Sequence, residues 1–182
     1  QANPWFPPNL SRTHHTPGGP DYCWWKLPED GKQMWKEVAL ISKGYGWTGL
    51  QMEVHIDNNG RLLWQDAFKV MLEGFKEANN EFYGAPFIGV SSQNSENAVK
   101  GLDTLISLIK GHPNLYCIDG APVLTFYGLG GLKPEEWVGV IKTIEEKYGR
   151  MIWLFNTWAG PVRNDIELLK QYLTVFDGIT QY

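Results

Sequence analysis

Glu53, His55 and Asp57 are the most chemically suggestive group in the sequence, because they recur at every second position. Alternate residues of a β-strand share one face, so this spacing predicts all three on one side, with His55 and Asp57 at the strand's carboxyl end. Carboxylates beside an imidazole can perform acid–base catalysis or bind a metal. The same spacing also occurs in any half-exposed strand, and Asp57-Asn58-Asn59-Gly60 is typical of a turn, so a structural role stays open.

Amides and aromatic rings follow the other predicted strands. Sugars present apolar C–H faces that stack on aromatic rings and hydroxyls that bond to amides and carboxylates, so this mixture predicts a glycan-binding cleft. The predicted binding residues, besides His55 and Asp57, are Gln93, Tyr127, Asn156, Trp158 and Gln181 at strand ends, with Trp24 and Trp25 from the N-terminal segment. The structural alternatives are a helix cap at Ser95 beside Gln93, and a hydrophobic plug formed by the two N-terminal tryptophans.

Composition and charge exclude several classes of protein. The chain has 182 residues, of which 43% are hydrophobic and 20% are charged, which is typical of one globular domain. The net charge of −4 provides no basic field for nucleic acid. No apolar run approaches the roughly 18–20 residues of a membrane span. The chain opens at Gln1 without a signal segment, as either a mature secreted protein or a shortened chain would. On the first of these readings we expect a secreted, periplasmic or cell-surface location.

No cofactor or metal is predicted. The two cysteines, Cys23 and Cys117, are too few for a disulfide scaffold or a metal site, and free thiols are the favoured state. The glycine cluster at 128–131 lacks the spacing and the lysine of a phosphate-binding loop. A Gly-x-Ser-x-Gly motif is absent, so no Ser-His-Asp arrangement is predicted.

The elements that must position these residues alternate between strand and helix. Strands are predicted near 50–56, 86–91, 122–127, 151–156 and 178–182, with a short extra strand at 115–118. Helical patterns begin near residues 32, 62, 95, 134 and 165. This α/β alternation predicts a parallel sheet. The strands recur about every 32 residues, the spacing expected of a (β/α)₈ barrel of about 250 residues.

The chain holds about five such units, so it is either a complete open sheet or a partial (β/α)₈ TIM-type barrel. The polar face of the first strand favours the partial barrel, because central strands of open sheets are apolar on both faces. We therefore predict a single, partial barrel domain over 1–182, with an irregular N-terminal segment at 1–30 that is rich in Pro and Gly. A missing sector would leave strand edges open, through which we expect association.

A family resemblance is carried by the stretch His112-Pro113-Asn114-Leu115-Tyr116-Cys117-Ile118-Asp119-Gly120-Ala121-Pro122-Val123-Leu124-Thr125-Phe126-Tyr127-Gly128. It resembles the α-1,3-glucanase (mutanase) and endo-α-mannosidase-like glycoside hydrolases. In those families a His-Pro, aromatic, Asp-Gly-x-Pro-Val stretch leads into a barrel strand. The resemblance covers about residues 32–182. It implies hydrolysis of a glycan by two carboxylates. The strand pattern, and not the resemblance, makes Glu53 the catalytic candidate in this chain, as a helper or a sugar ligand.

The sequence departs from that resemblance at the catalytic acids. In those families they lie in a Trp-Asn-rich segment after a late strand, whereas here Asn156-Thr157-Trp158 is followed by no acid before Asp165. The main catalytic pair is thus expected after Tyr182. Two alternatives remain: a non-catalytic carbohydrate-binding surface protein, and a complete open-sheet enzyme with another substrate.

Overall fold

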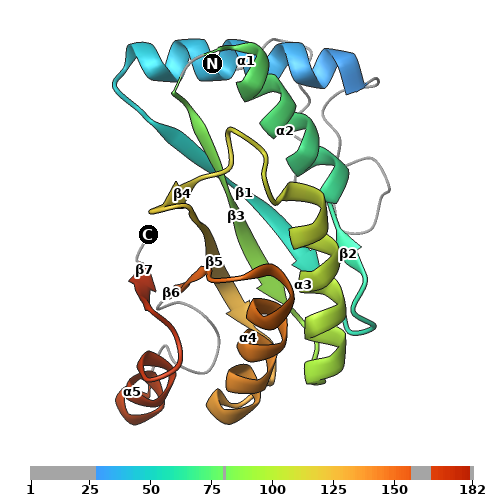
Figure 1. Cartoon of the computed structure of the whole chain (residues 1–182), viewed down its shortest axis with the longest axis vertical. Helices are drawn as coiled ribbons and strands as arrows, with labels where there is room; N and C mark the ends of the chain where they lie inside the picture. Colours follow the sequence, from blue (N-terminus) through green and yellow to red (C-terminus); the bar gives the residue numbers. More distant parts are fainter. Residues whose placement is uncertain (1–27, 80, 157–164, 181–182) are drawn as a thin grey trace, which may run out of the picture.

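The computed structural model describes residues 28–79, 81–156 and 165–180, and these form a mixed α/β fold (Figure 1). The described helices are α1 (Pro28–Gly44), α2 (Gln65–Glu77), α3 (Ser95–Ile109), α4 (Pro134–Tyr148) and α5 (Ile166–Leu173). The described strands are β1 (Gly49–Ile56), β2 (Leu62–Leu63), β3 (Tyr83–Val90), β4 (Cys117–Ile118), β5 (Ala121–Leu129), β6 (Ile152–Asn156) and β7 (Gly178–Thr180).

The sheet is largely parallel, as predicted. Its spatial order is β2-β1-β3-β5-β6-β7, and every pair from β1 to β7 along this path is parallel. The short strands β2 and β4 pair antiparallel with β1 and β5. The parallel strands thus follow one another in chain order without the reversal of a doubly wound sheet. Because crossovers between parallel strands are right-handed as a rule and these strands advance in one direction, successive helices are expected on the same face of the sheet.

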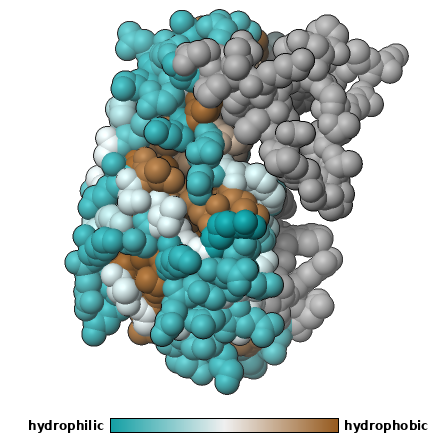
Figure 2. All heavy atoms as spheres, turned by 90° about the vertical axis from the view of Figure 1, so that its right-hand side faces the viewer, coloured by the Kyte–Doolittle hydropathy of each residue, from teal (hydrophilic) through white to brown (hydrophobic). Residues whose placement is uncertain are grey.

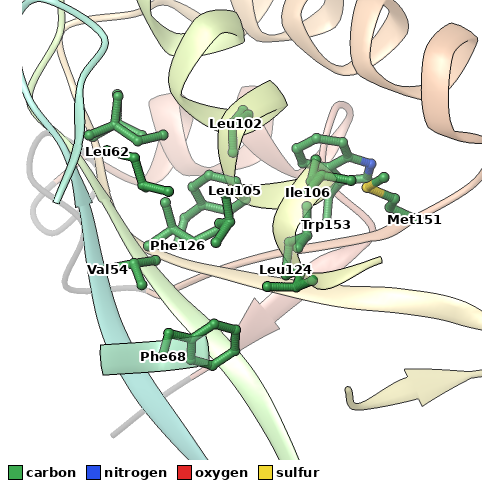
Figure 3. Packing of buried hydrophobic residues seen from close by; sticks show 14 of the residues in the cluster. Val54, Leu62, Phe68, Leu102, Leu105, Ile106, Leu124, Phe126, Met151 and Trp153 are labelled. Atoms are coloured by element: carbon green, nitrogen blue, oxygen red, sulfur yellow. The ribbon is translucent and has the colours of Figure 1, made fainter. Parts of the chain in front are cut away.

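One face of the sheet packs against the helices in a single hydrophobic cluster. Val54, Leu124 and Phe126 point from the strands toward Leu102 and Leu105 of α3 (Figure 3). Every described helix contributes buried side chains to this cluster, including Trp35 of α1 and Tyr172 of α5. The alternate residues of each strand therefore lie on the opposite face, which is where the sequence places its polar groups.

The helix starts follow from local chemistry. Asn94 caps α3 by accepting a hydrogen bond from the Glu96 amide at 2.8 Å, so the predicted cap at Ser95 was wrong by one residue. Asp165 caps α5 by accepting from the Leu168 amide. Pro134 occupies the first turn of α4, where its missing N–H costs nothing, as predicted.

Two predicted boundaries need correction. Helix α1 begins at Pro28, inside the segment predicted to be irregular. Helix α2 begins at Gln65, whereas the apolar spacing predicted a helix from Leu62. The difference arises because Leu62 and Leu63 pair with Ile56 and His55 as β2, so tertiary pairing overrides the helical pattern.

The face of the molecule shown in Figure 2 is mainly hydrophilic. Its described residues are mostly polar, and the apolar ones form separate patches. None of the described helices is long and apolar enough to cross a lipid bilayer.

Gly74 of α2 permits the close approach of α1, which gives a test of the packing. A Cβ at Gly74 would lie 2.6 Å from Cβ of Trp35 and 2.7 Å from the backbone oxygen of Lys32. Gly74→Ala should therefore lower the free energy of unfolding by about 1–3 kcal/mol, because α1 must move away. The matched control is Gly139→Ala in α4, where nothing lies within 4 Å of the new Cβ. That change should raise stability by about 0.5–1 kcal/mol. Urea unfolding measures both, and equal stabilisation by the two substitutions would contradict the packing.

Candidate functional site

The predicted alternation in β1 is confirmed. Val54 and Ile56 are fully buried under the helices, whereas Gln51 and Glu53 are exposed and His55 is half-buried on the other face. Since β1 pairs with β3 in register, His55 lies beside Gly89 and Glu53 beside Phe87. The polar residues of β1 thus line the open face of the sheet.

Hydrogen bonds join β1 to β5 above the intervening strand β3. The Tyr127 hydroxyl donates to Oε1 of Glu53 at 2.5 Å. The Tyr127 hydroxyl oxygen also lies 3.0 Å from Nδ1 of His55. Nε2 of His55 is 2.8 Å from Oγ of Ser91, the first residue after β3. We call Glu53, Tyr127, His55 and Ser91 the polar network. Nearer the start of the strands, Gln51 donates to the Thr125 hydroxyl at 3.3 Å.

The hydrogen bonds of the polar network form one chain, in which each group donates to the next. Tyr127 has one hydroxyl hydrogen and gives it to Glu53, so its oxygen accepts from Nδ1–H of His55. Nε2 of a neutral His55 then accepts the Ser91 hydroxyl hydrogen. Burial lowers the pKa of His55, although the negative charges of Glu53 and Asp57 act in the opposite direction. Hydrogen bonds therefore run from Ser91 to the Glu53 carboxylate through a neutral imidazole.

A strand irregularity and a glycine create room for Tyr127. The register between β3 and β5 shifts so that Ile88 faces Phe126 while Gly89 faces Gly128, which leaves Tyr127 as the extra residue on β5. The tyrosine then lies directly over Gly89. A Cβ at Gly89 would overlap the Tyr127 hydroxyl and lie 2.6 Å from Nδ1 of His55. No larger residue fits at this position without displacing the network.

Aromatic rings extend the polar network into a row. The Trp64 ring lies 5.8 Å from the His55 ring, His55 lies 6.4 Å from Tyr127, and Tyr127 lies 4.7 Å from Phe87. Trp64 has a left-handed backbone, with φ of 62°, at the start of α2. Such a conformation is unusual and costly for a bulky residue, so the fold holds the indole at this edge against local strain.

The remaining predicted site residues have different surroundings. The Asp57 carboxylate closes a turn by accepting from the backbone amides of Asn59 and Arg61, each at 2.9 Å, and pairs with the Arg61 side chain. Gln93 is exposed after β3, and its side chain lies against Gly131. Asn156 is buried at the carboxyl end of β6.

Four predicted residues lie outside the described part of the chain, namely Trp24, Trp25, Trp158 and Gln181. Their proposed roles, and those of Gln93, Asn156 and Asp57 in binding, stay predictions.

Ser91, Trp64, Phe87 and Gly89 were not among the predicted site residues. Ser91 had a usable signal, since it directly follows a predicted strand. Trp64 falls within the helical pattern predicted to begin near residue 62, and nothing in the sequence indicates its left-handed backbone. The pairing of Gly89 with Tyr127 depends on the register shift, which a sequence pattern does not reveal.

A hollow lies at the other end of the sheet. It has a volume of about 540 Å³ and is bordered by Cys117, Pro122 and Arg150. Cys117 is a free thiol there, and burial raises its pKa. Pro122 lies at the start of β5, so this hollow is separate from the polar network at the carboxyl end. Across residues 28–79, 81–156 and 165–180, no three His, Cys, Asp or Glu side chains cluster as a metal site requires.

Comparisons with protein-family models, curated proteins and solved structures gave no significant match to this chain. The case for a function therefore comes from the residues and their geometry.

The charge state of His55 can be tested directly. We expect His55 to titrate below the ordinary value of 6.5, because burial outweighs the two nearby carboxylates. Glu53→Gln should lower this pKa further, since it removes one of the charges that favour the imidazolium. Proton NMR of the imidazole between pH 4 and 8 measures both values. A pKa above 6.5 in the wild-type protein would contradict the arrangement.

The role of Gly89 gives a second test of the site. Gly89→Ala should displace Tyr127 and change both the His55 resonances and the pKa of His55. Gly128→Ala is the matched control, because its new Cβ would make only an ordinary contact, 3.5 Å from the Val90 nitrogen. The same NMR titration reads out both variants, and an unchanged His55 in Gly89→Ala would refute the proposed packing.

Proposed function

We propose that this chain binds a glycan at the carboxyl end of its parallel sheet, as part of a glycoside hydrolase-like barrel in which Glu53 is a catalytic or assisting carboxylate. The observation that carries the proposal is the aromatic row of Trp64, Tyr127 and Phe87 directly beside the polar network. A sugar-binding site needs aromatic rings and polar groups side by side, because the C–H faces of a sugar stack on rings while its hydroxyls need hydrogen-bond partners.

Two features of the sheet support the barrel. The parallel strands run in chain order, and the helices pack on one face, as in a (β/α)₈ barrel. In addition, Tyr127 of β5 meets Glu53 and His55 of β1 across a whole strand, although neighbouring strands lie about 4.8 Å apart. Side chains two strands apart meet most easily when their face of the sheet is concave.

The number of carboxylates decides between the two glycan hypotheses. Hydrolysis of a glycosidic bond uses two carboxyl groups, one as acid and one as base or nucleophile. In the described ranges Glu53 is the carboxylate hydrogen-bonded within the network, while Asp57 is held by its turn. The hydrolase hypothesis therefore needs a second acid from elsewhere. Without one, the same residues would serve a non-catalytic carbohydrate-binding protein of the cell surface or exterior.

The outer strand β7 suggests how a barrel would be completed. Within the described sheet β7 pairs with β6 on one side only. An open strand edge is a template for further pairing. We propose that barrel closure or association with a partner occurs at this edge.

Glycan binding by the aromatic row is tested by removing one ring. Trp64→Asn should weaken binding by about 1–3 kcal/mol, since it removes a stacking surface while Asn tolerates the left-handed backbone. Glu53→Gln should weaken it by a similar amount through loss of a charged acceptor. Calorimetric titration with α- and β-linked glucans and mannans measures the affinities, and release of reducing sugar separates hydrolysis from binding.

The matched control is Trp47→Asn. Trp47 is 57% exposed and precedes the opposite end of β1, so its loss should leave glycan affinity unchanged. Failure of the wild-type protein to bind any glycan of the panel would refute the proposal. So would equal affinities of wild type, Trp64→Asn and Glu53→Gln.

A further inference from the structure

Ser91 and His55 form a pair to which the glycan-binding proposal assigns no chemical step. Oγ of Ser91 lies 2.8 Å from Nε2 of His55, at the open carboxyl end of the sheet, and Ser91 is exposed. We infer that Ser91 is the nucleophile of an ester-hydrolysing site, with His55 as its general base and with Tyr127 and Glu53 as positioning residues.

The direction of the polar network supports this assignment. A serine hydroxyl becomes a useful nucleophile when an adjacent base takes its proton and a third group orients that base. Here Nδ1–H of His55 is held by the Tyr127 oxygen, which leaves Nε2 free of hydrogen and facing Ser91. The Tyr127 hydroxyl is in turn bonded to the Glu53 carboxylate. Positive charge that develops on the imidazole is thereby stabilised through one intervening hydroxyl.

Ser91 lies in a backbone setting that is typical of a nucleophilic serine. Gly89-Val90-Ser91-Ser92-Gln93 joins the end of β3 to α3, so the serine lies on a turn from strand to helix. It has the first glycine of Gly-x-Ser-x-Gly, whereas Gln93 replaces the second. The amide of Ser92 directly follows the serine, which is the position that supplies one oxyanion donor in hydrolases with this turn.

The reaction can be written with atoms in balance. Ser91 Oγ forms a bond to the carbonyl carbon of an ester while its proton passes to Nε2 of His55. The tetrahedral intermediate then expels the alcohol, which takes that proton, and an acyl-serine remains. Water attacks the acyl-serine, gives its proton to Nε2, and the carboxylic acid leaves as Ser91 regains its hydrogen. No oxidant, reductant or metal takes part.

The substrate class is an ester of a small acyl group. If the proposed glycan cleft is correct, the natural members are O-acylated sugars, since the aromatic row would hold the ring beside Ser91. The assignment of O-acylated sugars as substrates rests on the proposed function, whereas the assignment of Ser91 as nucleophile does not. The two are separated by using a simple ester and an acetylated polysaccharide in parallel.

The test uses the whole 182-residue chain, p-nitrophenyl acetate and a fluorophosphonate probe. Wild type should hydrolyse the ester and carry the phosphonyl adduct on the peptide that contains Ser91. Ser91→Ala should lose the adduct and the rate above background, and His55→Gln should lower kcat about 100-fold or more. Tyr127→Phe should lower kcat about tenfold with KM unchanged, as expected of a group that acts through His55.

Ser107→Ala is the matched control. Ser107 is an exposed serine of α3 that donates to the Thr104 carbonyl, so its loss should change neither the rate nor the labelling. Circular dichroism establishes that each variant is folded; Ser91 is exposed, so its truncation should leave the core intact. Equal rates or equal labelling of wild type and Ser91→Ala would overturn the inference, and so would an inert wild type.

The second part of the experiment uses acetylated mannan and acetylated xylan as substrates. Ser91-dependent release of acetate from either supports the inference together with the glycan cleft. Ser91-dependent hydrolysis of the simple ester alone supports the nucleophile and counts against an O-acylated sugar of these types as its substrate.

Discussion

The hydrogen bonds that join β1 to β5 above β3 are the interactions on which the candidate site depends. Glu53 and His55 cannot meet Tyr127 unless the strand between them leaves space, and Gly89 provides that space by having no side chain. The arrangement also needs the other face of each strand to be committed to the helices, since Val54 and Ile56 fix which side His55 faces. A slip of one residue in β1 would bury the imidazole and expose the core.

The register shift in β5 decides which groups the network contains. Without it, strict alternation would carry on from Tyr127, and Gly128 would turn toward the helices. The extra residue instead leaves both on the open face, with Leu129 returned to the core. One local irregularity therefore places a hydroxyl between an imidazole and a carboxylate while the helix-side packing is retained.

Much of the fold could be predicted from the alternation of strands with helices and from the spacing of apolar residues, whereas much of the candidate site could not. The β1 pattern correctly predicted which residues face away from the core, because burial enforces a period of two. The five parallel strands followed from strand–helix alternation. In contrast, β2 was missed because Leu62 and Leu63 also fit a helical stripe, and their pairing with β1 is a tertiary effect. The left-handed Trp64 and the contact of Gly89 with Tyr127 depend on backbone geometry that residue types do not encode.

A carboxylate, an imidazole and a serine joined by hydrogen bonds can support two chemistries, and the group that acts on the substrate distinguishes them. Glycoside hydrolysis needs Glu53 to act on the sugar itself, which its second oxygen, Oε2, could do while Oε1 keeps the Tyr127 hydrogen bond. Ester hydrolysis needs the same bond to stay, because it is the means by which Glu53 stabilises His55 while Ser91 reacts. The Tyr127–Glu53 hydrogen bond is therefore compatible with both functions, and the position of the substrate separates them. A ligand whose reacting bond lies against Oγ of Ser91 favours ester hydrolysis, and one whose glycosidic bond lies against the Glu53 carboxylate favours glycoside hydrolysis.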